Sequence, residues 1–241
     1  MRLLVRTWNV FHGNASPPER HAFLEQMVRL TVADGPDVLC LQELPISSLR
    51  RLPGWSGMTV LSDVTKRPLL RSAELGRMVT DLHHGVLRSA FTGQANAILV
   101  SHPLRMLQHR SIVLNPARER RLCQAVRLET ERQTLVVANL HVDRRSADEE
   151  ILRAAEFVEG FTAENEPIVL AGDFNVALGE SSALRELAGP KWEFAGATPT
   201  GIDHVLARGM RGSPGAQWPV ERRTVGGRVL SDHAPVDREL V

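Results

Sequence analysis

Acidic, amide and imidazole side chains recur at the ends of segments whose patterns predict β-strands. These positions are Asn9, Glu43, Asn139, His141, Asp173, Asn175, Asp203, His204, Asp232 and His233. Asp173 directly follows the apolar run 167–171, and a carboxylate in such a place is costly unless it has a use. Oxygen and imidazole ligands without cysteine suit a hard cation such as Mg²⁺ or Mn²⁺ better than structural zinc, so the residue types predict a divalent-cation site.

The elements that carry these residues begin with a strand–helix–strand unit. The segment 2–10 alternates as a strand does, and 37–43 is a nearly all-apolar run typical of a strand covered on both faces. Between them, residues 17–20 open a predicted helix that closes near 34–36. Strand ends at one edge of a sheet are where α/β proteins assemble sites, so we expect the polar residues to form one pocket.

The remaining elements follow from the same patterns. Four runs predict an antiparallel meander: 95–101, 107–114, 123–130 and 134–142. Helices are predicted at 146–161 and 181–187, and strands at 167–171, 202–207 and 234–240. The signal is weak between residues 44 and 94, where a strand is predicted at 55–61 and a loop at 81–93.

Composition places the chain among globular α/β proteins. Of its 241 residues, 43% are hydrophobic and 24% are charged, which excludes a disordered or coiled-coil chain. Because no repeat or polar linker divides the sequence, residues 1–241 are expected to form one domain. No run approaches the roughly 18 to 20 apolar residues of a membrane span, and Cys40 and Cys123 are expected to be buried thiols. With no signal peptide recognised, these features predict a cytoplasmic protein.

Charge is uneven along a chain whose formal net charge is only +1. Residues 64–132 contain 12 basic and 5 acidic residues, and residues 133–188 contain 4 basic and 11 acidic ones. A basic segment beside an acidic one is typical of a polyanion-facing surface next to a cation site, although two solvated faces give the same pattern.

Seven short motifs, taken in order, resemble those of the endonuclease/exonuclease/phosphatase superfamily, which includes deoxyribonuclease I, abasic-site endonucleases, neutral sphingomyelinases and inositol polyphosphate 5-phosphatases. They are Thr7–Val10, Leu41–Glu43, Gln94–Ser101, Ala138–His141, Gly172–Asn175, Gly201–His204 and Ser231–His233. Each is short, but the whole series in order is specific. The resemblance implies an α/β fold, a four-layered sandwich of two twisted mixed β-sheets packed face to face with helices outside. It also implies Mg²⁺-dependent attack of water on a phosphate ester.

The resemblance further implies a metal site and two substrate contacts. Glu43 is expected to be the main metal ligand with the help of Asn9, and Asp232 to bind the metal directly or through water. Asn96 and Asn139 are expected to lie at the substrate, although each asparagine taken alone has the simpler explanation of a turn or core hydrogen bond.

The catalytic roles are implied in the same way. Asp173 is expected to orient or deprotonate the attacking water, and Asn175 to hydrogen-bond a phosphate oxygen. His233 is expected to contact the phosphoryl group while Asp203 fixes its tautomer, and His141 to bind the phosphate or protonate the leaving group. Phosphodiesters resist hydrolysis because the nucleophile meets negative charge. A metal, two imidazoles and a carboxylate supply the positive charge and the base that the reaction needs.

These implications favour a phosphodiesterase or nuclease, with nucleic acid among its candidate substrates. A phosphomonoesterase and a phospholipid or inositol phosphate hydrolase of the same superfamily are the alternatives, and a non-catalytic scaffold of the same fold is the third interpretation. The chain contains no tyrosine, whereas the abasic-site enzymes use a tyrosine near the phosphate where this chain has His141. That departure argues against the abasic-site branch.

Other polar residues have simpler interpretations. The remaining histidines are expected to be solvated or hydrogen-bonded without a catalytic role: His12, His83, His84, His102, His109 and His204. The run Arg118–Arg121 is expected to form a solvated turn rather than a phosphate grip.

Overall fold

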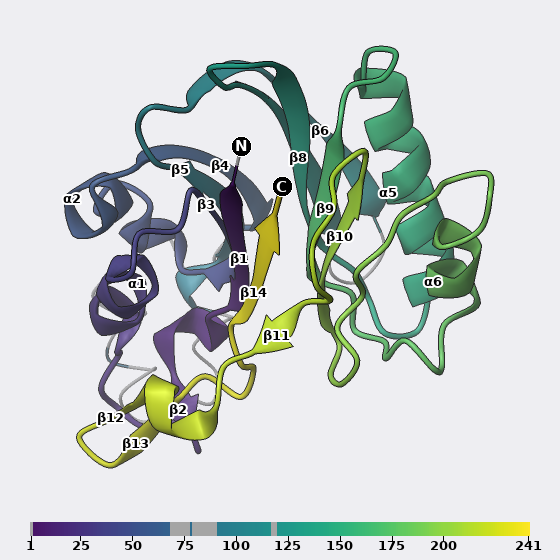
Figure 1. The fold of residues 1–241 in the computed structure, drawn as a ribbon. Helices are drawn as coiled ribbons and strands as arrows, with labels where there is room; N and C mark the ends of the chain where they lie inside the picture. The colour runs from purple at the N-terminus through teal and green to yellow at the C-terminus, as the bar shows by residue number, and fades with distance from the viewer. Residues whose placement is uncertain (1, 68–77, 79–90, 117–119) are drawn as a thin grey trace.

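Two large mixed β-sheets face each other in this computed structural model, which describes residues 2–67, 78, 91–116 and 120–241 (Figure 1). The first sheet has the strand order β11-β14-β1-β3-β5-β4. Its strands are β1 (Leu3–Asn9), β3 (Val38–Leu44), β4 (Thr59–Lys66), β5 (Gln94–Val100), β11 (Ala216–Gln217) and β14 (Val236–Leu240).

The second sheet has the order β10-β9-β8-β7-β6. Its strands are β6 (Arg105–Asn115), β7 (Arg121–Glu129), β8 (Thr134–His141), β9 (Ile168–Asp173) and β10 (Asp203–Arg208). A small third sheet joins β2 (Ala15–Ser16), β12 (Thr224–Val225) and β13 (Arg228–Leu230). The short 3₁₀ helices are η1 (Phe11–Gly13), η2 (Ile46–Ser48) and η3 (Val220–Arg223).

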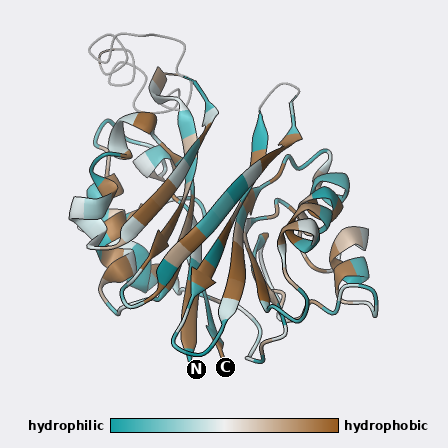
Figure 2. Cartoon of the chain, turned by 90° about the horizontal axis from the view of Figure 1, so that it is seen from above, coloured by the Kyte–Doolittle hydropathy of each residue, from teal (hydrophilic) through white to brown (hydrophobic). Residues whose placement is uncertain are grey.

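Helices cover the outer face of each sheet. They are α1 (Leu24–Val32) and α2 (Leu52–Ser56) on the first sheet, and α5 (Ala147–Phe161) and α6 (Ser182–Leu187) on the second. Seen from above, the two sheets lie between these two helical layers (Figure 2). The structure therefore has the four layers that the family resemblance implies.

Alternation along each strand divides the core into three apolar clusters. On β8, Val137 packs between the sheets, whereas its neighbours Val136 and Ala138 pack against α5. Side chains of a strand point to opposite faces in turn, so a strand covered on both sides must be apolar throughout. This explains why the buried runs read from the sequence show no polar face.

The predicted meander is wrong in one strand. β5 pairs with β3 and β4 in the first sheet, and only β6, β7 and β8 form the antiparallel meander, in the second sheet. Every residue of β5 is buried, as a central strand requires, whereas most of β6 is exposed at the edge of its sheet. The turn at Pro103 therefore leads the chain from one sheet to the other rather than into a hairpin.

Two other element boundaries differ from the prediction. The strand expected at 55–61 begins only at Thr59, because Pro53 opens the short helix α2 and Gly57 ends it at a φ of 70°. The helix expected from residue 17 begins at Leu24. Most of the loop predicted at 81–93 lies outside the described residues.

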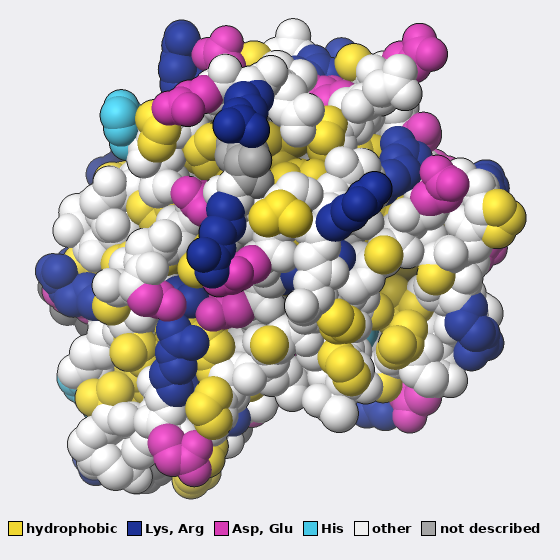
Figure 3. All heavy atoms as spheres, viewed as in Figure 1, with side chains coloured by type: hydrophobic (Ala, Val, Ile, Leu, Met, Phe, Trp, Pro, Cys, Tyr) yellow, Lys and Arg dark blue, Asp and Glu magenta, His cyan; other side chains and the backbone are white. Residues whose placement is uncertain are grey.

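The described residues contain no helix that is long and apolar enough to cross a membrane. Cys40 and Cys123 are buried free thiols, as expected. On the face shown in Figure 3, basic and acidic side chains are interspersed rather than separated into patches of one sign.

Candidate active site

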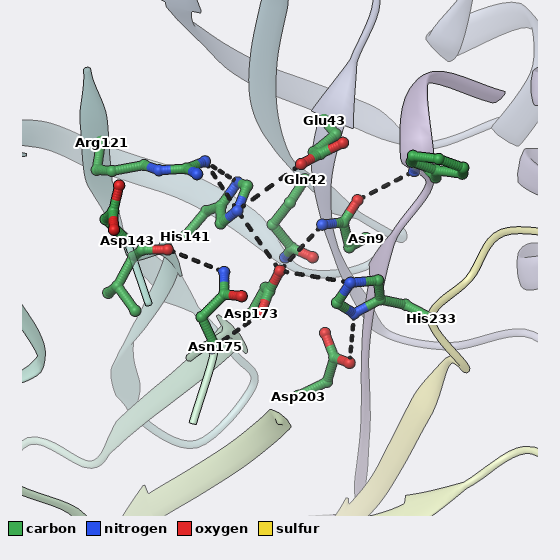
Figure 4. Close-up of polar contacts among 12 residues, drawn as sticks. Asn9, Gln42, Glu43, Arg121, His141, Asp143, Asp173, Asn175, Asp203 and His233 are labelled. Atoms are coloured by element: carbon green, nitrogen blue, oxygen red, sulfur yellow. Dashed lines mark hydrogen bonds and ion pairs between the residues drawn. The ribbon is translucent and has the colours of Figure 1, made fainter. Parts of the chain in front are cut away.

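The predicted site residues meet where strand ends of the two sheets converge. β1 is parallel to β3, and β8 is parallel to β9, so the ends of all four strands can reach one edge of the sandwich. β10 and β14 run antiparallel to β9 and β1, which brings the beginnings of these two strands to the same edge. The residues brought together are Asn9, Glu43, His141, Asp173, Asn175, Asp203 and His233 (Figure 4).

His233 lies between two carboxylates. Its Nδ1 is 2.8 Å from Oδ2 of Asp203, and its Nε2 is 3.8 Å from Oδ2 of Asp173. Burial favours the neutral ring, but Asp203 outweighs burial and raises the pKa of His233 to about 10. The imidazole is therefore cationic at neutral pH, and Asp203 fixes its orientation.

Asp173 is the most enclosed carboxyl group of the site. Its Oδ2 accepts a hydrogen bond of 3.0 Å from the Asn9 amide, and its Oδ1 accepts one of 2.9 Å from the backbone N–H of Asn175. Burial, together with the nearby Asp203 carboxylate, raises the pKa of Asp173 above its usual range. When ionised, a carboxylate of this kind is a stronger base than an exposed aspartate.

Glu43 enters the site from an irregularity in β3. The pairing of β3 with β5 shifts between Leu41 and Leu44, and Glu43 has a φ of 57°, so its side chain is aimed differently from its neighbours. Although burial opposes its charge, a hydrogen bond and electrostatic attraction from His12 hold the pKa of the Glu43 carboxyl well below its usual range. The side chain is 18% exposed, so an ionised carboxylate is accessible from solvent.

His141 is paired with an arginine that the sequence patterns assigned to solvent. Arg121 is the first residue of β7 and is buried, with Nη1 2.8 Å from Nε2 of His141 and 3.0 Å from its Nδ1. For Arg121 the prediction of a solvated turn is therefore wrong, because β7 starts there and directs the side chain inward. Arg120 is exposed, and residues 118 and 119 lie outside the described residues. Burial and the Arg121 charge lower the pKa of His141 to about 3, so its ring is neutral.

Asn139 joins the two sheets below the site. Its amide nitrogen donates to the carbonyl oxygens of Leu41 (3.1 Å) and Ala97 (3.0 Å), and its Oδ1 accepts a hydrogen bond of 2.8 Å from Gln42. Gln42 in turn donates to Thr7. These bonds cross from β8 to the opposite sheet and hold the strand ends in register.

Two predicted residues stand apart from this network. Asn96 is fully buried opposite the β3 irregularity, and among the described residues neither atom of its amide has a hydrogen-bond partner. Asp232 is exposed beside His233, and within the described ranges its carboxylate is hydrogen-bonded to Ser231 but to neither Glu43 nor Asn9.

Backbone strain is concentrated at this site. Seven described non-glycine residues have a positive φ, and five of them lie in or directly beside the site: Phe11, His12, Glu43, Asn175 and Ser231. Such conformations cost about 1–3 kcal/mol each and persist only where the surroundings impose them. At Ser231 the hydroxyl supplies part of this constraint, because it donates to the Asn9 carbonyl at 2.7 Å and accepts from the His233 N–H at 3.1 Å.

Of the other histidines named in the sequence, His102 and His109 are exposed, as expected, and His83 and His84 lie outside the described residues. His204 has the structural role that was expected, since its Nδ1 accepts from the Thr198 N–H and its Nε2 lies 3.0 Å from the Val176 carbonyl. His12 is hydrogen-bonded, as expected, but its partner is Glu43. No pattern placed His12 at the site, because it follows the first strand in a turn whose path the sequence does not specify.

The donors present fit a hard divalent cation. Asp173, Asp203 and His233 each offer an atom within 4.8 Å of the others, but the close Asp203–His233 contact already engages that imidazole. Glu43 keeps one carboxylate oxygen outside its hydrogen bond with His12, and Asn9 adds an amide oxygen that also accepts a hydrogen bond of 3.0 Å from the Phe11 N–H. An accessible carboxylate and an amide, with water completing the set, are typical Mg²⁺ donors.

Comparison with known proteins gives the family and the fold. The model of the Endonuclease/Exonuclease/phosphatase family matches residues 7–233. A comparison with curated protein sequences finds no significant match.

Solved structures with the same fold include three from different organisms. A functionally unknown conserved protein from Enterococcus faecalis aligns with a TM-score of 0.72 at 18% identity, covering 99% of both chains. The human Nocturnin catalytic domain with bound sulfate aligns with a TM-score of 0.72 at 14% identity, covering 100% of this chain and 94% of the other. The Bacteroides thetaiotaomicron mannosyl-6-phosphatase aligns with a TM-score of 0.71 at 17% identity, covering 99% of both. Identities this low establish a common architecture only.

Proposed function

Because the chain belongs to the endonuclease/exonuclease/phosphatase family, we propose that it hydrolyses phosphate esters with a divalent cation, by attack of water on phosphorus, and that phosphodiesters including nucleic acid are its substrates. The observation that carries the proposal is the line of contacts from Asp203 through His233 to Asp173. These contacts place the cationic imidazole of His233 beside the Asp173 carboxyl group, whose pKa is raised. Attack of water on a phosphate ester requires a positive charge for the phosphate oxygens and a base for the water.

Asp173 is the base in this proposal. Its ionised carboxylate takes a proton from water, and the hydrogen bonds from the Asn9 amide and the Asn175 N–H hold it in place. The Asn175 side chain donates to the Val142 carbonyl, which leaves its amide oxygen and second N–H for the phosphate or the water. General-base catalysis of this kind contributes typically 10²- to 10⁴-fold to the rate.

His233 and His141 bind the phosphoryl group in different charge states. The His233 cation faces the developing negative charge and is kept protonated by Asp203. His141 is neutral, so its role is to donate a hydrogen bond to a phosphate oxygen, and the leaving oxygen takes its proton from solvent water. Arg121, which contacts His141, adds a positive charge on the same side of the site.

A bound Mg²⁺ or Mn²⁺ supplies positive charge to the phosphate oxygens and lowers the pKa of a bound water. Glu43 and Asn9 would hold this ion, and the exposed Asp232 would contribute directly or through water. Asn96 is proposed to support substrate binding from beneath the site, because its amide is fully buried and has no partner among the described residues. The Asn139 amide is engaged between the sheets, so its contribution to substrate binding is to position the neighbouring strands.

Two features bear on the class of ester. The positive charge of residues 64–132 favours a polyanionic substrate, and Arg121 brings part of that charge next to His141. A phosphomonoester is the second candidate, since a mannosyl-6-phosphatase shares the fold. The mixed charges in Figure 3 show that the face drawn there is not a basic surface.

The proposal is tested by Mg²⁺- and Mn²⁺-dependent hydrolysis of a panel with and without EDTA. The panel contains bis-p-nitrophenyl phosphate, p-nitrophenyl phosphate, supercoiled plasmid, single-stranded RNA, sphingomyelin and inositol phosphates. We expect diester hydrolysis that EDTA abolishes and that weakens with salt on polymers, because each neutralised phosphate contributes to the salt dependence of binding. Turnover confined to monoesters selects the second candidate. No turnover on any member contradicts the proposal and makes the scaffold interpretation a contender.

A further inference from the structure

The turn after β1 carries a histidine back to the Glu43 carboxylate. Phe11, His12 and Gly13 have positive φ values of 45°, 53° and 77°. Gly13 permits this path because a Cβ at that position would lie 2.9 Å from Cβ of Leu24. Three consecutive left-handed residues reverse the chain, so that His12 is buried against the end of β3 instead of facing solvent.

The two oxygens of Glu43 face different neighbours. Oε2 lies 3.2 Å from Nε2 of His12, whereas Oε1 lies 3.8 Å from Nε2 of His141. The His12 side chain is 3% exposed and the Glu43 side chain 18% exposed, so His12 contacts the carboxylate from the protein interior. A carboxylate oxygen can only accept, and Nε2 of His12 must therefore be the donor.

We infer that His12 is a positioning residue of the divalent-cation site: its Nε2–H fixes Oε2 of Glu43 and thereby leaves Oε1 directed into the site to bind the ion. The inference rests on the proposed role of Glu43 as metal ligand. It gives a function to a histidine that lies outside the motifs matched in the sequence. Groups that hydrogen-bond to metal ligands typically contribute 10- to 100-fold to metal affinity.

The cost of the arrangement supports this role over a purely structural one. His12 and Glu43 both have strained backbones, and within the described ranges the buried Nδ1 of His12 has no hydrogen-bond partner. A buried polar atom without a partner costs about 1–3 kcal/mol, so a histidine that served stability alone would be a poor choice here. If His12 is retained for its contact with Glu43, that contact explains why the strained backbone and the unpartnered Nδ1 are kept.

The test measures Mn²⁺ binding to the full chain after purification in EDTA, by electron paramagnetic resonance of the free ion. His12→Gln keeps a long side chain with an N–H donor, and His12→Met has similar length without one. His12→Asn is too short to reach Glu43, yet it tolerates the left-handed backbone better than most residues. His109→Asn on the exposed part of β6 is the matched control. Circular dichroism and thermal unfolding in EDTA establish that each variant is folded.

We expect the Met and Asn variants to bind Mn²⁺ 10- to 100-fold more weakly, and the Gln variant and the control to stay within a few-fold of the wild type. If His12→Met is poorly folded, the comparison of the Asn and Gln variants decides. Wild-type affinity in folded Met or Asn variants overturns the inference. A nitrogen coupling to bound Mn²⁺ that pulsed resonance detects in the wild type but not in His12→Gln also overturns it, because His12 is then a ligand itself.

Glu43→Gln separates the two levels of the argument. If this variant weakens Mn²⁺ binding while the His12 variants do not, only the inference about His12 fails. If Glu43→Gln binds Mn²⁺ like the wild type, the metal site of the proposed function fails, and the inference fails with it.

Discussion

Replacing Asp203 by asparagine is expected to abolish the elevated pKa of His233. In the wild type the Asp203 carboxylate lies 2.8 Å from Nδ1 of His233 and, with smaller contributions from Asp173 and Asp232, outweighs burial to raise the pKa of the ring from 6.5 to about 10. That difference corresponds to at most about 5 kcal/mol of preference for the cationic ring. An asparagine keeps the shape and can accept a hydrogen bond, but it carries no charge, so burial is opposed only by the two remaining carboxylates.

The sign of the effect on stability follows from the direction of the pKa change. A histidine whose pKa is higher in the folded state stabilises the protein fully below its unfolded pKa, and this contribution is lost as pH rises through the folded pKa. The wild type is therefore expected to lose up to about 5 kcal/mol of its free energy of unfolding from this group between pH 6.5 and 10. Asp203→Asn is expected to start lower and to show a much smaller loss over the same window.

The assay is nuclear magnetic resonance titration of the imidazole signals in metal-free protein held in EDTA, combined with urea unfolding at several pH values. His204 is an internal control, because its pKa is lowered by burial and its signals are expected to stay those of a neutral ring across the window. A wild-type His233 that titrates near 6.5, or one that titrates alike in wild type and variant, would refute the electrostatic reasoning.

Four further changes test separate parts of the structure. Asp173→Asn is expected to lower the turnover of phosphate esters by about 10²- to 10⁴-fold in steady-state assays, with unchanged circular dichroism. The control Glu164→Gln, on the surface, is expected to have no effect on turnover. Normal turnover by Asp173→Asn would show that Asp173 is not the base. Arg121→Met is expected to raise the pKa of His141 above about 3 in a resonance titration, although burial, the largest cause, still holds it below 6.5. An unchanged pKa would show that the Arg121 charge does not contribute. Ser231→Ala removes the hydroxyl that links Asn9 and His233 and is expected to lower the free energy of unfolding by about 1–3 kcal/mol. An unchanged free energy of unfolding in urea denaturation would contradict this expectation. Ile98→Ala between the sheets is expected to cost about 2–5 kcal/mol in the same assay, and a cost below 1 kcal/mol would mean that the core collapses around the cavity.

Local patterns were sufficient for most strands and for the residues at their ends. The buried run before Asp173 and the amphipathic helix 146–161 could be placed because hydrophobic periodicity follows directly from the geometry of strands and helices. Once the strands are known to be parallel or antiparallel as observed, the meeting of Asp173, Asp203 and His233 at one edge follows from their positions at strand ends.

Partners across the two sheets could not be predicted in the same way. A short turn such as the one at Pro103 is compatible with a hairpin and with passage to the opposite sheet, and only the burial of β5 between β3 and β4 distinguishes them. Arg121 illustrates the same limit, since the charge run that contains it looks solvated until the start of β7 directs its side chain toward His141.

The amino-acid sequence by itself determined which groups are available: the carboxylates, amides and imidazoles at strand ends, and the motif series that identifies the family. Tertiary structure alone decided their chemistry. The elevated pKa of His233, the neutral ring of His141 and the ionised state of Glu43 each depend on burial and on charges from other strands. Burial and Coulombic interaction depend on distance in space, and the distances between Asp203, Arg121 or His12 and their partners exist only after the two sheets have packed together.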